Sequence, residues 1–569
     1  MVAVAERPEL PKRLSFWPWL VGFIVVVAAV FEVYGPALNG PFMLDDTYLP
    51  FMHPGWEHLP LRLWLRGVRP LLMFSFWVNF QLSERNPFTY HVLNVVIHIL
   101  NGGLVFAIAS RILSKLDMDP WRRRVLAVFG AALFLFHPLQ TESVSYVASR
   151  SETLSVFFFY LAFGIFLWRR RDNVSWGTSI VVVALFGAAC STKEHTLVLP
   201  ALLLLTDYYW NPPFSLRGIK LNWRLYGSIA VVAVLGGIAL VRLLARANSA
   251  GFHVRNLNWY EYFLTQGRAI WVYLGKFILP VHQNIDYEFA ISRSLIDKGA
   301  IFGLLGLALV TVAAWLYRRR IPLASYGWFT FLLLIAPTSS FVPIQDPLVE
   351  RRLYLPFIGL VLILLDLLRR WNPPRRLLAI ALALVIVAEA AATWQRNQVW
   401  GDKIAMWQDA SSKSPGKVRP QFQLAHAYFD LGQFGVAADE YAKAAKIKPP
   451  KYDLLVDWGI TLAYEGRFDD ALAKLQWAAN LERSAYVYTQ IAMVDGRAGR
   501  YPEALAALDI AEKINPRQEL IYEYRGTVYF KQGDPARAVS EFRRALAMDP
   551  NNDRLLGMIA QAQQAPVRP

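Results

Sequence analysis

The chain has 569 residues, enough for three or four average domains, but its composition is not that of a soluble array. Hydrophobic residues make up 55% and charged residues 18%, against about 25% charged residues in ordinary globular proteins. This composition excludes intrinsic disorder, and a single cysteine excludes a disulfide scaffold. Of the net charge of +16, residues 1–400 carry +15 and residues 401–569 carry +1. The positive charge therefore accompanies the apolar part, which argues for a membrane and against nucleic acid as a partner.

Apolar stretches near the length of a membrane span fill residues 16–394. Basic clusters lie at every second connection between them, and the positive-inside rule predicts that all of these are cytoplasmic: 12–13, 115–124, 169–171, 217–224, 318–320 and 369–376. The stretch 262–280 breaks this alternation and contains Gln266, Gly267, Arg268 and Lys276, so we expect it to be interfacial or re-entrant. Eleven spans follow, with the amino terminus inside and the carboxy terminus outside. The first, residues 16–34, has no small-residue cleavage site and is expected to remain as a span.

The loops predicted outside the cytoplasm hold most of the unusual polar residues. We expect a polytopic membrane domain at 1–400, with its first external loop at 35–90. An external or re-entrant segment at 246–298, with Arg255, Arg268 and Tyr287, could form a lid. The working face is therefore predicted to be extracytoplasmic.

Residues 418–550 repeat a pattern of small and aromatic residues with spacings of 34, 33 and 34. This is the tetratricopeptide period, in which small residues let paired helices approach closely. The predicted domain at 401–569 is an α-solenoid with repeats at about 418–451, 452–484, 485–517 and 518–551 and a capping helix at 552–565. Such an array binds an extended peptide or a partner helix; self-association or docking on its own membrane domain is the alternative. The predicted fold is all-α.

An acidic pair, Asp45-Asp46, directly follows the first predicted span. Adjacent carboxylates repel each other, which raises one pKa and suits a general base or a cation site. Other candidate site residues share the predicted external face: Arg69, His137, Glu142, Arg150, Glu152, Lys193, Glu194, Glu350, Arg351 and Tyr354. Ionisable groups at membrane depth are costly and are functional candidates by default. Internal ion pairs such as Glu142–Arg150, holding helices in register, are the alternative, and His137 is more typical of a helix cap than of a metal ligand.

Carboxylates combined with Arg and Lys beside a membrane suit sugar transfer from a lipid-phosphate leaving group. The acid would deprotonate an acceptor hydroxyl, and the basic residues would stabilise the released phosphate. The sequence has no Gly-rich phosphate loop, so a polyprenyl-phosphate-linked sugar is the expected donor. No His/Cys/Asp cluster has zinc-ligand spacing. We expect no required cofactor, and a divalent cation held by Asp45 and Asp46 stays open.

The acidic pair resembles the first-loop motif of the GT-C membrane glycosyltransferases. An ordered set of motifs resembles the transmembrane and tetratricopeptide-repeat protein O-mannosyltransferases: Arg69-Pro70-Leu71, His91-Val92-Leu93-Asn94, the loop from His137-Pro138 to Glu152, Lys193-Glu194, and Glu350-Arg351 with Leu353-Tyr354-Leu355-Pro356. The resemblance covers nearly the whole chain, including the repeats. It implies inverting transfer of mannose from a polyprenyl-phosphate carrier to Ser or Thr of a protein.

The same resemblance implies roles for individual residues. Asp45 would be the general base, and Asp46 would orient it or the acceptor. Arg150, Lys193 and Arg351 would bind phosphate, and Glu142 would be a positioning residue. The implied location is a bacterial inner membrane with the repeats in the periplasm. Two alternatives remain: the same donor with an envelope glycolipid or polysaccharide as acceptor, and a non-catalytic membrane scaffold with a repeat docking surface.

Overall fold

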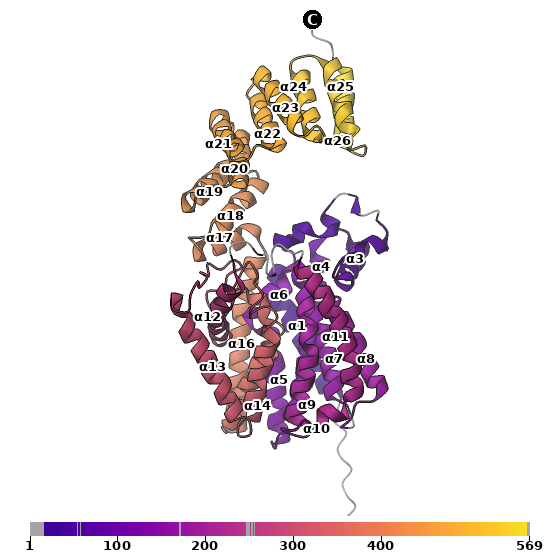
Figure 1. Cartoon of the computed structure of the whole chain (residues 1–569), viewed down its shortest axis with the longest axis vertical. Helices are drawn as coiled ribbons and strands as arrows, with labels where there is room; N and C mark the ends of the chain where they lie inside the picture. The colour runs from indigo at the N-terminus through magenta and orange to yellow at the C-terminus, as the bar shows by residue number, and fades with distance from the viewer. Residues whose placement is uncertain are drawn as a thin grey trace, which may run out of the picture. The chain divides into compact units, whose positions relative to one another are not determined.

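The computed structural model describes residues 16–53, 55–56, 59–169, 172–245, 251, 254 and 257–565 (Figure 1). The chain divides into two compact units, Met1–Lys403 and Ile404–Pro569, and each is described by itself. Regular structure in the described residues is helical. Some residues of the expected basic clusters, Lys12, Arg13, Arg170 and Arg171, lie outside the described residues, as does Arg255 of the segment 246–298.

The first unit is a bundle of α-helices joined by short 3₁₀ turns. Its α-helices are α1 (Phe16–Tyr34), α2 (Leu61–Trp64), α3 (Pro70–Ser83), α4 (Pro87–Leu113), α5 (Pro120–Phe136), α6 (Thr141–Ser145), α7 (Arg150–Leu167), α8 (Trp176–Cys190), α9 (Leu199–Trp210), α10 (Arg217–Leu221), α11 (Trp223–Leu244), α12 (Trp259–Ile278), α13 (Ala300–Leu316), α14 (Pro322–Ile335), α15 (Phe357–Arg370) and α16 (Arg375–Trp400). The 3₁₀ turns are η1 (Gly35–Ala37), η2 (Leu44–Tyr48), η3 (Pro50–Met52), η5 (Pro138–Gln140), η6 (Val147–Ser149), η7 (Glu194–Val198), η8 (Asp297–Gly299) and η9 (Glu350–Leu353).

Among the described residues, six helices are long and apolar enough to cross a membrane. They are Leu20–Ala37, Pro87–Leu113, Val147–Leu167, Trp223–Arg242, Asp297–Leu316 and Arg375–Trp400. Pro120–Phe136 and Pro138–Ser145, bent by 50° at their junction, make a seventh if they count as one span. The expected eleven spans are not confirmed, because apolar helices such as α8 and α14 have only 15 and 14 residues, below the ~20 residues of a full span. The segment expected to be interfacial forms α12, which is not among the six.

Sequence signals explain where the helices of this unit begin. Proline stands in the first turn of α3, α4, α5 and α14, where its missing N–H costs no helical hydrogen bond. Asn86 caps α4 by accepting a hydrogen bond from the Phe88 N–H at 3.1 Å.

Two glycines allow α14 and α15 to approach closely. A Cβ on Gly359 would lie 2.6 Å from the Phe331 nitrogen, and one on Gly327 would lie 2.6 Å from the Gly359 carbonyl oxygen. Small residues at such crossings are typical of helix packing in membranes.

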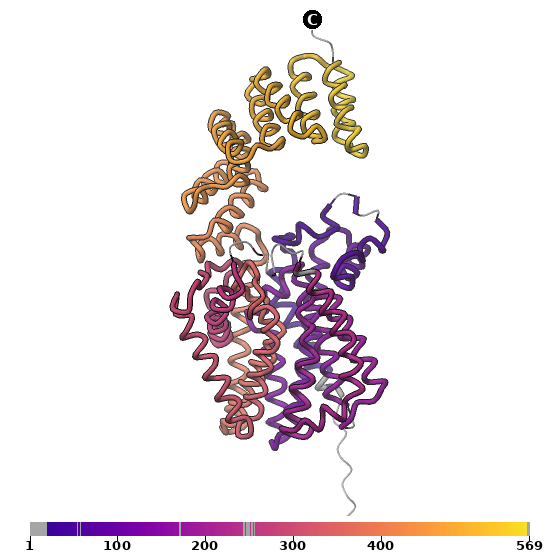
Figure 2. The backbone as a smooth tube through the Cα atoms, viewed as in Figure 1, coloured from indigo at the N-terminus to yellow at the C-terminus, as the bar shows by residue number. Residues whose placement is uncertain are grey.

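The second unit is a solenoid of antiparallel helix pairs that follow one another in chain order (Figure 2). Its helices are α17 (Lys403–Lys413), α18 (Val418–Asp430), α19 (Phe434–Ile447), α20 (Tyr452–Glu465), α21 (Phe468–Leu481), α22 (Ala485–Arg497), α23 (Tyr501–Ile514), α24 (Glu519–Lys531), α25 (Pro535–Leu546) and α26 (Asp553–Gln564). Each hairpin turns at a glycine with φ between 72° and 89°, the left-handed region that favours glycine: Gly432, Gly466, Gly499 and Gly533. Within a pair, a Cβ on Gly459 would lie 2.7 Å from the Leu475 side chain, so glycine permits the close packing.

Candidate functional site

The two adjacent carboxylates lie in η2 and have different surroundings. Asp46 is buried, and its carboxylate accepts hydrogen bonds from the Met43 N–H at 3.0 Å and the Ala148 N–H at 2.7 Å. Burial raises the pKa of Asp46 to about 7. Asp45 is exposed, and its backbone N–H donates to the Tyr146 hydroxyl at 2.8 Å. Asp46 therefore holds the turn to the loop before α7, and Asp45 presents its carboxylate to the surroundings.

The residue before the pair has a strained backbone. Leu44 adopts φ 54°, which costs a non-glycine residue about 1–2 kcal/mol. Such conformations persist where the surrounding contacts over-determine them, and they cluster at functional sites. Here those contacts include the two backbone hydrogen bonds to Asp46.

Tyr146 connects the acidic pair to Arg351. The Arg351 guanidinium lies 6.0 Å from the centre of the Tyr146 ring, and this ring stacks on Trp400 with centroids 6.1 Å apart. Arg351 also donates from Nη1 to Glu142 Oε1 at 2.5 Å and from its backbone nitrogen to Glu142 Oε2 at 3.0 Å. Glu142 thus fixes both the backbone and the guanidinium of Arg351.

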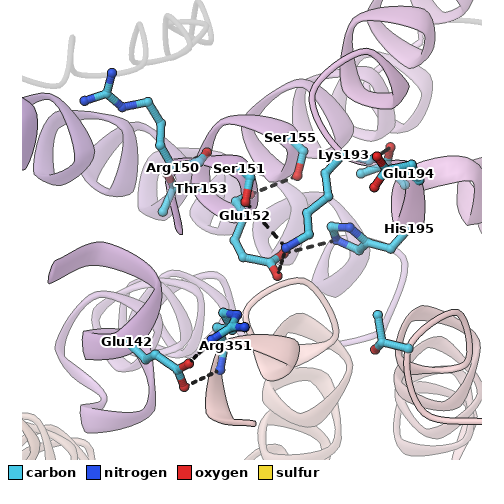
Figure 3. A network of polar contacts seen from close by, with 12 residues as sticks. Glu142, Arg150, Ser151, Glu152, Thr153, Ser155, Lys193, Glu194, His195 and Arg351 are labelled. Carbon is cyan, nitrogen blue, oxygen red and sulfur yellow. Dashed lines mark hydrogen bonds and ion pairs between the residues drawn. The ribbon is translucent and has the colours of Figure 1, made fainter. Parts of the chain in front are cut away.

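A second ion-pair group adjoins the first (Figure 3). The Lys193 ammonium donates to Glu152 Oε1, and the His195 Nε2 lies 3.4 Å from Glu152 Oε2. Arg69 donates to both carboxylate oxygens of Glu194, at 2.8 and 2.9 Å. Such bidentate pairs fix the plane of the guanidinium.

The three cations Arg69, Lys193 and Arg351 share one electrostatic environment. Burial lowers the pKa of Lys193, and the charges of Arg69 and Arg351 lower it further, whereas Glu152 raises it. The cationic side chains are 36%, 16% and 31% exposed, and their carboxylate partners are 18%, 6% and 3% exposed. In each pair the cation is more exposed than its carboxylate partner. This arrangement suits an anionic ligand.

The side chain of Arg150 points away from the Glu142–Arg351 and Glu152–Lys193 pairs (Figure 3). Its buried guanidinium donates to Asn94 Oδ1 and Asn79 Oδ1, each at 2.8 Å, and to the Tyr90 carbonyl at 3.1 Å. It also lies 4.5 Å from the centre of the Phe76 ring. These contacts join α7 to α3 and α4. These partners position Arg150 between the three helices, and its expected phosphate-binding role stays a prediction.

Three other candidates have contacts of their own. Tyr354 is buried among helices, with its hydroxyl 2.9 Å from His98 Nδ1 and 3.0 Å from Asn101 Nδ2. His137 caps η5 by accepting from the Leu139 N–H at 3.2 Å. Glu350 accepts hydrogen bonds from Gln283 Nε2 at 2.7 Å and from the Tyr287 hydroxyl. It therefore binds the segment around residues 283–287, which follows α12. None of these contacts places the three side chains among the cations.

Three residues without a predicted role belong to the site: Tyr146, His195 and Trp400. His195 directly follows Glu194 in the sequence, and Tyr146 lies four residues from both Glu142 and Arg150, a weaker signal of the same kind. Trp400 carries no such signal, because its partner is 254 positions away. The described residues contain no group of three or more His, Cys, Asp or Glu side chains that could hold a metal ion.

Comparison with protein families identifies the repeats. Models described as tetratricopeptide repeat match residues 418–451 and 489–553. The predicted presence of tetratricopeptide repeats is therefore confirmed, and the bounds of the individual repeats stay a prediction. A solved structure titled as YrrB, a tetratricopeptide-repeat protein with an unusual peptide-binding site, is 18% identical and covers 31% of this chain and 88% of that one, with a TM-score of 0.24.

Comparison with curated proteins covers most of the chain. Protein O-mannosyl-transferase F38B6.6 of Caenorhabditis elegans is 22% identical over 77% of this chain and 64% of its own length. Protein O-mannosyl-transferase TMTC3 of Mus musculus is 22% identical over 86% of this chain and 58% of its own length. The chain thus spans about three fifths of the length of these relatives. The resemblance expected from the motifs is confirmed: this chain is a homologue of proteins named TMTC protein O-mannosyl-transferases, with tetratricopeptide repeats at its carboxy-terminal end.

Proposed function

We propose that the chain is a GT-C membrane glycosyltransferase that transfers mannose from a polyprenyl-phosphate donor to a Ser or Thr hydroxyl of a protein. The observation that carries the proposal is the exposed Asp45, which Tyr146 connects to Arg351, one of three cations that are each more exposed than their carboxylate partners. A base next to an anion site is what this transfer needs. The names of the relatives support a protein acceptor.

In the proposed reaction the acceptor oxygen attacks the anomeric carbon as Asp45 takes the hydroxyl proton. A new carbon–oxygen bond forms on one face of the sugar, and the bond to the phosphate oxygen breaks on the other, so the configuration inverts. The electron pair of the broken bond leaves on the polyprenyl phosphate. Lys193 and Arg351 stabilise that developing charge, and fixed donors at such a position contribute about 2.7–4 kcal/mol each.

Each ion pair has a part in this scheme. Glu142 and Glu152 hold Arg351 and Lys193 in place before the donor arrives, which lowers the cost of ordering two long side chains. Asp46 orients the turn that carries Asp45. The active face would be extracytoplasmic in a bacterial inner membrane, and the tetratricopeptide repeats would present the acceptor protein.

The test is transfer by the purified full chain from radiolabelled polyprenyl-phosphate-mannose to Ser/Thr peptides. Removing a general base typically costs about 10²–10⁴-fold in rate, so Asp45→Asn should lose that much turnover without a change in thermal stability. Asp117→Asn, an exposed acid at the opposite end of α4, is the matched control.

Two outcomes would redirect the proposal. Full turnover in Asp45→Asn would remove this residue from the mechanism. No turnover by well-folded wild-type protein with any lipid-linked sugar, on peptide or glycan acceptors, would favour a scaffold in which the ion pairs only hold helices in register.

A further inference from the structure

A second polar pocket lies where three helices of the membrane unit end. The carboxy-terminal ends of α4, α7 and α9 meet around a cavity of about 70 Å³. Its lining includes Arg111, Lys115, Arg169, Asp207 and Trp210. The pocket is far below the ~300–1,000 Å³ of sites that enclose drug-sized ligands, so it suits a small charged group.

This pocket is distant from the site described above. Asn94 and Arg111 both belong to α4, and their separation by 17 positions corresponds to about 26 Å along a helix. In Figure 1 the α10 end of the unit lies opposite the end at α6. The two sites therefore lie near opposite ends of α4.

Backbone carbonyl groups fix the two arginines of the pocket. Arg111 donates from Nε to the Leu167 carbonyl at 2.9 Å, and Arg169 donates from Nη1 to the Phe166 carbonyl at 2.8 Å. These carbonyls belong to the last turn of α7, which has no helical donors for them and favours cations. The guanidinium groups are thus held in place without a ligand.

The acid at the centre of the pocket is already satisfied. Asp207 Oδ1 accepts from Arg169 at 2.7 Å, and Oδ2 accepts from Asn222 at 2.6 Å and from the Tyr226 hydroxyl at 2.7 Å. Three cations line the pocket against two carboxylates, those of Asp207 and Asp172. Positive charge therefore remains after the internal pairing.

Two observations show what the pocket lacks. The Trp210 indole N–H is buried and has no hydrogen-bonding partner among the described residues. Partial desolvation lowers the pKa of Lys115, the charges of Arg111 and Arg169 lower it further, and those of Asp172 and Asp207 raise it. A negatively charged hydrogen-bond acceptor would pair with the Trp210 N–H. It would also reduce the repulsion among Lys115, Arg111 and Arg169.

We propose that this pocket binds the phosphate of an anionic phospholipid headgroup. Both α4 and α7 are long and apolar enough to span a membrane and end at the pocket, which places it at the level of the bilayer surface. Trp168, next to the pocket, is exposed, and Trp176 and Trp223 form an exposed pair with centroids 6.1 Å apart. Tryptophan is enriched at this level, and basic pockets between spans bind anionic headgroups.

The test is native mass spectrometry of the delipidated full chain in detergent, with phosphatidylglycerol, phosphatidylcholine or inorganic phosphate added. We expect wild type to retain one phosphatidylglycerol in preference to phosphatidylcholine. Lys115→Gln should weaken that binding about fivefold, the effect of one basic residue near a membrane surface. The matched control Lys220→Gln, an exposed lysine of α10 outside the pocket, should leave it unchanged.

Trp210→Phe keeps an aromatic ring and removes the N–H donor. It should also weaken phosphatidylglycerol binding, and it tests the site if Lys115→Gln does not fold. Equal retention of the two lipids would overturn the proposal, as would equal weakening by Lys115→Gln and Lys220→Gln. Phosphate binding that depends on Lys115, without a preference for phosphatidylglycerol, would identify free phosphate as the ligand and overturn the headgroup.

Discussion

The buried carboxyl of Asp46 should make the folded protein less stable as the pH rises. Burial raises the pKa of Asp46 from 3.8 to about 7, so between these values the folded chain holds a proton that the unfolded chain releases. This contribution favours the folded state at low pH and is lost as the pH rises through 7. At about 1.36 kcal/mol per pKa unit, the change is on the order of 4 kcal/mol in the free energy of unfolding.

Asp46→Asn isolates this effect because asparagine stays neutral at every pH. Its one carbonyl oxygen can serve one of the two backbone N–H donors, and its amide turns an N–H toward the other, at a cost of about 1–3 kcal/mol. Two of the pKa units lie between pH 5 and 7, so over this range we expect the stability of the variant relative to wild type to rise by about 2.7 kcal/mol and to stay constant above it.

Thermal unfolding of the purified full chain in detergent between pH 5 and 8 measures the difference between the two proteins. Asp117→Asn, whose side chain is exposed, should show a constant small difference from wild type and serves as the control. A constant difference between Asp46→Asn and wild type over this range would refute the raised pKa and the burial argument behind it.

Three further predictions concern packing and the ion pairs. In Gly359→Ala the new methyl group would lie 2.6 Å from a backbone nitrogen of α14, so we expect a loss of about 1–3 kcal/mol; an unchanged Tm would contradict the close approach. Glu142→Gln leaves Arg351 without its counter-charge, so turnover should fall at least about tenfold, the equivalent of 1.4 kcal/mol. If the variant instead turned over as fast as wild type, Arg351 would be excluded from phosphate stabilisation. Glu194→Gln breaks a partly exposed ion pair worth about 0–1 kcal/mol, so Tm should barely change. The KM for the donor should rise because Arg69 loses its orientation. An unchanged KM would place Arg69 outside the donor site.

The repeats could be predicted in detail because their physics is local. A glycine in the left-handed region and a small residue at the helix crossing recur every 33 or 34 residues, so one pattern appears four times. The number of spans could not be predicted in this way. Helices such as α8 and α14 are apolar but short, and hydropathy does not tell a short span from a helix packed inside the bundle.

The identity of the charged residues was readable from the sequence, but their pairing was not. Glu142 pairs with Arg351, 209 positions away, rather than with the nearby Arg150. Arg150 appears equivalent to Arg351 in sequence, and only the three-dimensional environment shows that its donors are occupied by Asn79 and Asn94. Tyr354 stands in a motif with Arg351 but faces the helical core.

The stacking of Tyr146 on Trp400 has a consequence for biosynthesis. Asp45 leaves the ribosome early, yet the aromatic pair that supports its neighbourhood is complete only after 400 residues have been made. A nascent membrane domain therefore exposes its acidic turn long before that turn is assembled. Under the proposed function, transfer activity should therefore appear only late in synthesis, once α16 with its terminal Trp400 is in place.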